Sequence, residues 1–449
     1  MSKSPSLWKT FLVFLAPMML TNILQSLVGT INGIYLGQMI GVDALAAVSA
    51  FFPVMFFFIS FVIGLGAGAS VLIGQAWGAR EPEKVRAVAG TALTVALLGS
   101  AAIAIFGGLF TRQLLTALAT PSGILDAAEG YARIMMITMP LTFVFILLTS
   151  MLRGTGDTLT PLVALAISAG VGLLATPALI KGWLGLPQLG IASAAWASAI
   201  SGVFTLLWLT LDLRRRRHVL AFDGAFLRAM RIDGALLRKV LNLGIPSAAG
   251  MVTMSVAELV LLGLVNGYGS GATAAYGAVN QVLGYAQFPA VSIAITVSIF
   301  GAQAIGRGNS NQIGSIVRTG LLMNLVLTGS LVALAYLLSR IIMGFFIVDA
   351  AVLELAQRLL HIVLWSSVLF GMAIVFSGAM RSSGTVWAPL SIQIFAIAGI
   401  EVPSAILLGR TIGIDGIWTA YPIAFSSMFL LQMTYYLLVW RKRAIRRLI

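Results

Sequence analysis

Two glutamates, Glu258 and Glu401, lie deep inside long apolar segments of this sequence. Glu258 follows Gly244 by 14 residues and Glu401 follows Val386 by 15, so each lies about 21 Å or more along a helix. Away from water, an ionised carboxylate is costly unless it takes up a proton or meets a cation. Both side chains are therefore candidates for exchanging a coupling ion. The alternative is a protonated carboxyl that hydrogen-bonds to a neighbouring helix, which for Glu401 includes backbone groups freed by Pro403.

Other polar side chains also fall at membrane depth and are candidates for contacting the coupling ion or a substrate. They are Gln25, Asn32, Thr176, Asn280 and Gln281. Hydrogen bonds between helices are the commoner use of such side chains in a membrane. The two interpretations stay open for each of them.

The chain offers little else for covalent or metal chemistry. It has no cysteine and only two histidines, His218 and His361, which excludes disulfides, thiolate sites and a histidine-rich metal cluster. No Walker-type phosphate loop for ATP is present. No nucleophile and base stand in a recognisable arrangement. We therefore expect no enzyme and no cofactor, with H+ or Na+ as the exchanged ion.

The elements that hold these residues must be membrane helices. Hydrophobic residues make up 59% of the 449 and charged residues only 9%, against about 25% charged in a soluble globular protein. Lipid offers backbone groups no partner, so apolar stretches of about 20 residues are predicted to be helices. Twelve such stretches lie near 10–36, 45–77, 87–110, 130–151, 160–180, 189–212, 244–267, 274–305, 315–339, 355–380, 386–409 and 416–440. The predicted fold class is an all-α polytopic membrane protein.

The net charge of +14 comes from basic residues that lie mostly in the loops on one side of these spans. One side carries 22 of the 28 Lys and Arg residues. The positive-inside rule predicts that this side, with both termini, is cytoplasmic. We expect membrane lipids as neighbours and no nucleic-acid partner.

The sequence repeats itself, which divides it into two lobes. Arg153–Pro161 reads RGTGDTLTP, and 228 residues later Arg381–Pro389 reads RSSGTVWAP. We expect a first lobe over 1–213, a basic amphipathic linker over 214–243 lying at the membrane interface, and a second lobe over 244–449. Six spans per lobe make the repeats parallel, and parallel repeats around a central cleft are typical of transporters.

The whole chain resembles the multidrug and toxic compound extrusion (MATE) family. The resemblance is most specific at the motif between spans 4 and 5, where Arg153, Gly154, Gly156, Asp157 and Pro161 match the family pattern. It implies a twelve-helix, two-lobed exporter that exchanges an organic, often cationic, compound for H+ or Na+. It also implies structural or gating roles for the five motif residues.

The sequence departs from the family pattern in the first lobe. Proton-coupled members carry an aspartate in span 1, but Asn32 stands in its place here, and Thr176 stands ahead of Pro177 where the family often has an acid. Neither side chain exchanges a proton, so we expect coupling in the second lobe, at Glu258 and Glu401.

The resulting hypothesis is a monomeric antiporter in a bacterial inner membrane that exports a small amphipathic or cationic molecule. The alternatives are a flippase for a lipid-linked precursor and an exporter dedicated to one metabolite. A flippase predicts extra spans and buried cations, whereas the charges buried in this chain are acidic.

Overall fold

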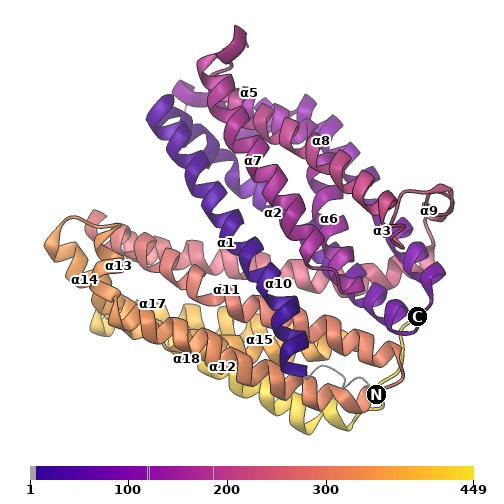
Figure 1. Cartoon of the computed structure of the whole chain (residues 1–449). Coiled ribbons are helices and arrows are strands. Elements are labelled where there is room, and N and C mark those ends of the chain that lie inside the picture. The colour runs from indigo at the N-terminus through magenta and orange to yellow at the C-terminus, as the bar shows by residue number, and fades with distance from the viewer. Residues whose placement is uncertain (1–6, 119, 121, 186) are drawn as a thin grey trace. The chain divides into compact units, whose positions relative to one another are not determined.

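The computed structural model describes residues 7–118, 120, 122–185 and 187–449, and over these residues the regular structure is helical (Figure 1). The long helices are α1 (Leu7–Met39), α2 (Val42–Gly78), α3 (Pro82–Ala102), α5 (Ser122–Ile137), α6 (Met139–Thr155), α7 (Leu159–Lys181), α8 (Ala192–Arg215), α10 (Gly234–Asn266), α11 (Ser270–Gly306), α12 (Ile313–Leu337), α14 (Ala350–Val363), α15 (Ser366–Ser382), α17 (Val402–Ile412) and α18 (Ile414–Leu438). Shorter elements are α4 (Thr111–Ala117), α9 (Gly224–Ala229), α13 (Ser339–Gly344), α16 (Trp387–Ile394), the π-helical turns η1 (Ile103–Gly107) and η4 (Phe395–Glu401), and the 3-10 turns η2 (Trp183–Gly185), η3 (Ser310–Gln312) and η5 (Trp440–Lys442).

The helices confirm the predicted twelve spans. Among the described residues, ten helices are long and apolar enough to cross a membrane, and the number rises to twelve when each of two bent pairs counts as one span. The bent pairs are α5 with α6, at 49°, and α14 with α15, at 40°. They coincide with the fourth span of each predicted lobe, so the bend belongs to the repeat.

The chain forms two compact units. Unit 1 consists of Met1–Leu15 with Pro246–Ile449, and unit 2 consists of Ala16–Ile245. The boundaries fall inside α1 and α10, beside Pro17 and Pro246, the proline inside each of these helices. Helix α10 begins at Gly234 rather than near 244, and its residues up to Ile245 belong to unit 2.

Unit 1 is organised around α11. This helix packs against α12, α14 and α15, and α15 packs in turn against α18. Residues of α11 such as Ile293 and Val297 are fully buried. At one edge, Phe300 packs edge-to-face against Phe11, with ring centroids 5.0 Å apart. A second buried cluster of this unit, which includes Leu283, Phe370 and Phe425, borders the acidic residues described below.

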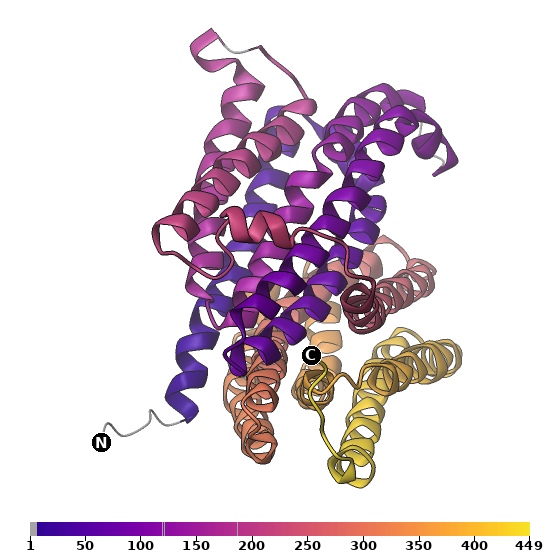
Figure 2. The same cartoon turned by 90° about the vertical axis from the view of Figure 1, so that its right-hand side faces the viewer.

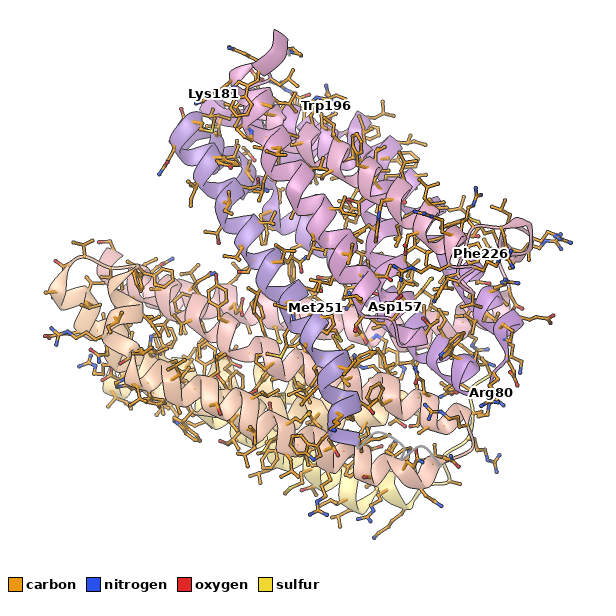
Figure 3. All side chains as sticks on the ribbon, in the orientation of Figure 1. Arg80, Asp157, Lys181, Trp196, Phe226 and Met251 are labelled. Atoms are coloured by element: carbon orange, nitrogen blue, oxygen red, sulfur yellow. The ribbon has the colours of Figure 1, made fainter. Side chains whose placement is uncertain are left out.

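The connections between the helices of unit 2 lie at its two ends. Arg80, Asp157 and Phe226 lie toward one end of its helices, and Lys181 and Trp196 lie toward the other (Figure 3). Close packing of α2 on α6 depends on Gly154, since a Cβ there would lie 2.8 Å from the backbone oxygen of Ser70. Glycine at such positions lets two membrane helices approach closely.

The linker between α8 and α10 contains one short helix. Helix α8 continues to Arg215, and only the six residues of α9 are helical before α10 begins at Gly234. Asp223 caps α9, since its Oδ1 accepts the Phe226 N–H at 2.7 Å. Phe226 is fully buried, and α9 lies across α3 (Figure 2). Part of the apolar pattern of the linker therefore serves packing against the protein.

Candidate functional site

Glu258 and Glu401 line one pocket within unit 1. Glu258, on α10, is exposed, whereas Glu401, at the end of η4, is only 4% exposed. Helices α10 and α16 are joined by a hydrogen bond, in which Gln393 Nε2 donates to the backbone oxygen of Gly250 at 3.3 Å. Each glutamate follows its partner in that contact by eight residues. Both side chains contribute to the wall of the same pocket.

The pocket is small and mostly apolar. Its volume is about 90 Å³, enough for a few water molecules, whereas drug-sized ligands occupy pockets of about 300–1,000 Å³. Five polar residues contribute to its wall: Glu258, Asn280, Gln287, Glu401 and Tyr421. The other lining residues are apolar or glycine: Met254, Ala257, Leu283, Gly284, Phe370, Ala396, Ile397, Ala424, Phe425 and Met428. The site suits an ion, a proton or the charged head of a larger molecule.

The π-helical turn that ends at Glu401 has a local cause. Pro403 lacks a backbone N–H and its ring crowds the carbonyl of Gly399, four residues earlier. A wider turn over Phe395–Glu401 accommodates this disruption before α17 begins. π-Helical turns inside α-helices frequently occur at functional sites. Here the turn brings Glu401 against α18, which packs on η4.

Two tyrosines form a hydrogen-bonded wall beside the acidic residues. The Tyr276 hydroxyl donates to the backbone oxygen of Glu258 at 3.1 Å and lies 3.3 Å from the Tyr421 hydroxyl. The rings of both tyrosines pack against Trp418, with centroids 5.2 and 5.7 Å away. This wall links α10, α11 and α18 around the pocket, so the position of Glu258 depends on Tyr276.

The structure separates the remaining predicted residues. Asn280 lines the pocket, but its neighbour Gln281 does not: Gln281 is exposed and donates to the Tyr285 hydroxyl at 3.2 Å. Gln25 is exposed on α1. Thr176 is buried and donates to the Gly172 carbonyl at 2.8 Å, a bond within its own helix.

Asn32 belongs to unit 2, whereas the residues of the acidic pocket belong to unit 1. Among the described residues, its buried Oδ1 accepts no hydrogen bond. An unsatisfied buried amide oxygen has a free-energy cost.

The sequence did not single out several pocket residues. Phe370, Tyr421, Phe425 and Met428 come from α15 and α18 and look like ordinary core positions in the sequence. For Tyr421, one signal was available: Pro422 directly follows it inside a span, where freed backbone groups need polar neighbours.

The family motif forms the joint between α6 and α7. Gly156 ends α6 in the left-handed region at φ 98°, which favours glycine. Asp157 then accepts the backbone N–H of Thr160 at 2.9 Å and its hydroxyl at 2.5 Å, while Pro161 is buried in the first turn of α7. Arg153 is half-buried in the last turn of α6. These contacts support a structural role for the motif.

The nearby linker contributes one more ionisable group. His218 follows α8, and its Nδ1 accepts the Leu220 N–H at 3.2 Å, which requires a neutral ring. Burial lowers the pKa of His218, and the carboxylate of Asp157 offsets part of that effect.

Comparisons with known proteins agree with this architecture. The MatE family model matches twice, over residues 17–177 and 246–407. The "Probable multidrug resistance protein YoeA" of Bacillus subtilis (strain 168) is 44% identical over 447 residues, covering 99% of this chain and 96% of that protein. The multidrug export protein MepA of Staphylococcus aureus (strain NCTC 8325 / PS 47) is 22% identical, covering 96% and 93%.

Solved structures share the fold. A mutant of the Vibrio cholerae MATE transporter VcmN has a TM-score of 0.90 at 19% identity, covering 98% of each chain. A MATE protein in the straight conformation has a TM-score of 0.88 at 22% identity, covering 96% of this chain and 95% of its own. The two matches of the family model start at Pro17 and Pro246 and together cover most of the chain, as the internal repeat predicts. This protein belongs to the MatE family, whose members are membrane transporters and not enzymes.

Proposed function

We propose that this transporter exports organic, cationic or amphipathic compounds in exchange for protons, and that the pocket containing Glu258 and Glu401 is the coupling site. The observation that carries the proposal is the meeting of these two carboxyls, from α10 and η4, in one pocket. The similarity to YoeA and MepA, whose names refer to multidrug resistance and export, supports the substrate class. The excess of Lys and Arg on one side supports cytoplasmic termini.

The walls of the pocket favour a proton over a sodium ion. Most lining residues are apolar, and apolar surroundings stabilise a neutral carboxyl relative to a carboxylate. A bound Na+ needs a dense shell of oxygen atoms, whereas a proton needs one carboxyl. The pocket contains two carboxyls, so it can take up two protons and become neutral.

Exchange then follows from competition for the same negative charge. With both carboxyls protonated, the pocket has no charge with which to hold a cation. Loss of protons restores the negative charge and attracts the cationic head of a compound, whose bulk remains outside a cavity of this size. Proton uptake on the other side of the membrane releases the compound. Tyr276 holds the backbone of Glu258 in place through this cycle.

The test uses purified protein in liposomes with an imposed pH gradient or, separately, a sodium gradient. We expect the pH gradient alone to drive movement of a fluorescent organic cation, and Glu258→Gln to abolish it. The matched control is Gln281→Ala, since Gln281 lies one residue from the pocket but is exposed. Movement driven only by sodium would replace the proton in this proposal. No movement of any cation by either gradient would favour a dedicated metabolite or a lipid-linked precursor as substrate.

A further inference from the structure

The linker between α8 and α10 is fixed to α3. Arg86 Nε on α3 donates to the backbone oxygen of Val219 at 3.1 Å, and its Nη2 lies 3.4 Å from Asp223 Oδ2. One turn further along α3, the Thr91 hydroxyl donates to the backbone oxygen of Arg231 at 3.0 Å. The linker is therefore held to unit 2 at both ends of α9.

This attachment places the linker beside the N-terminal part of a predicted membrane span. Helix α3 with η1 spans Pro82–Gly107, 26 residues, or about 39 Å, which exceeds an apolar layer of about 30 Å by about 9 Å. Gly90 lies about 12 Å along this helix, and a Cβ there would lie 2.2 Å from the backbone oxygen of Ala229. The end of α9 is thus packed against the first third of a helix that is long enough to cross a membrane.

The outer face of the linker combines cations with exposed apolar side chains. Phe226 is buried toward the protein, while its neighbour Leu227 is 56% exposed and Ile232 is 51% exposed. Arg228 and Arg231 stand beside them and are also exposed, as are the four arginines Arg214–Arg217. Apolar tips among cations are typical of surfaces that lie on anionic lipid.

We propose that the exposed face of the linker, Leu227, Arg228, Arg231 and Ile232 with Arg214–Arg217, is a binding surface for anionic phospholipid headgroups. Its cations bind the lipid phosphates, and Leu227 and Ile232 enter the upper acyl region. Charge complementarity identifies the occupant: the segment from Asp212 to Asp233 contains six arginines and three aspartates, so its net charge is positive. A merely solvated basic loop does not require exposed apolar residues among its cations. The proposal is independent of the coupling mechanism.

The absence of cysteine makes the test direct, because a single introduced cysteine is the only labelling site. Leu227→Cys is labelled with a fluorophore in nanodiscs that contain phosphatidylglycerol or phosphatidylcholine with a nitroxide near the top of the acyl chain. At equal mole fraction, we expect the nitroxide-labelled phosphatidylglycerol to quench the fluorophore at least about twofold more strongly than the labelled phosphatidylcholine. This preference should decrease when NaCl is raised from about 0.05 M to about 0.5 M. The added substitutions Arg228→Gln and Arg231→Gln should remove it.

The matched control carries the same label at Val348→Cys, in the loop between α13 and α14, where the side chain is 99% exposed. We expect no lipid preference there. Equal quenching by both lipids at position 227, no quenching by either, or a preference that persists after loss of both arginines would each overturn the proposal. Transport by the double variant, measured alongside, verifies that the protein is folded.

Discussion

Replacing Gly90 by alanine should loosen the linker from α3. The Cβ of an alanine would lie 2.2 Å from the Ala229 oxygen and 2.5 Å from its carbonyl carbon. Both are backbone atoms, so no rotamer change relieves the contact. The linker must move by about 1 Å to restore van der Waals separation, and the bond from Thr91 to Arg231 lies directly beside it.

The expected magnitude follows from two opposing effects. Overpacking of this kind costs about 1–3 kcal/mol, and replacing glycine by alanine inside a helix gains about 0.5–1 kcal/mol. Gly99, on the same helix, has no atom within 4 Å of a Cβ, so Gly99→Ala keeps the gain without the clash. The two variants should differ by about 1–3 kcal/mol in local stability.

Hydrogen exchange of the backbone amides around α9, together with thermal unfolding in detergent, measures this difference. We expect faster exchange over 219–233 in Gly90→Ala and unchanged or slower exchange in Gly99→Ala. Identical exchange in the two variants would refute the close packing of the linker on α3.

Two further predictions concern ionisable groups. If both pocket carboxyls exchange protons, a pH difference of one unit at zero membrane potential should stop net transport at a substrate concentration ratio of about 100 across the membrane. In Glu401→Gln, with one exchanging carboxyl, this balancing ratio should be about 10. A balancing ratio near 10 in the unmodified protein would contradict the two-proton pocket. The lowered pKa of His218 means that the unfolded chain binds more protons between the folded pKa and the ordinary value. The contribution of His218 to the free energy of unfolding is therefore complete above about pH 6.5 and is lost as the pH falls. The unfolding temperature of His218→Gln should depend less on pH over this range than that of the unmodified protein. An equal pH dependence of the two unfolding temperatures would contradict this prediction.

The sequence was sufficient for the span pattern because each lipid-facing helix must be apolar along its length. The constant offset of 228 residues between matching segments was sufficient to predict the internal repeat. The family model also matches the chain twice. What the sequence could not resolve was the direction in which each side chain points. Asn280 and Gln281 are neighbours of similar polarity, yet only Asn280 lines the pocket, because helix rotation depends on packing by other helices.

The linker shows the same limit at the surface. Phe226 and Leu227 alternate with charged residues in one amphipathic pattern. One of them is buried on the protein and the other is exposed. Only the packing of α9 on α3 distinguishes the two, and that contact joins residues more than a hundred positions apart.

The proposed exchange of protons for a cation in the pocket of Glu258 and Glu401 is tested most directly by counting protons released when a cation binds. Calorimetry of an organic cation in buffers of different ionisation enthalpy gives this number for the detergent-solubilised protein. We predict proton release by the unmodified protein near neutral pH and none by the Glu258→Gln, Glu401→Gln double variant, with cation binding weakened. Equal proton release by both proteins would contradict the assignment of coupling to this pocket.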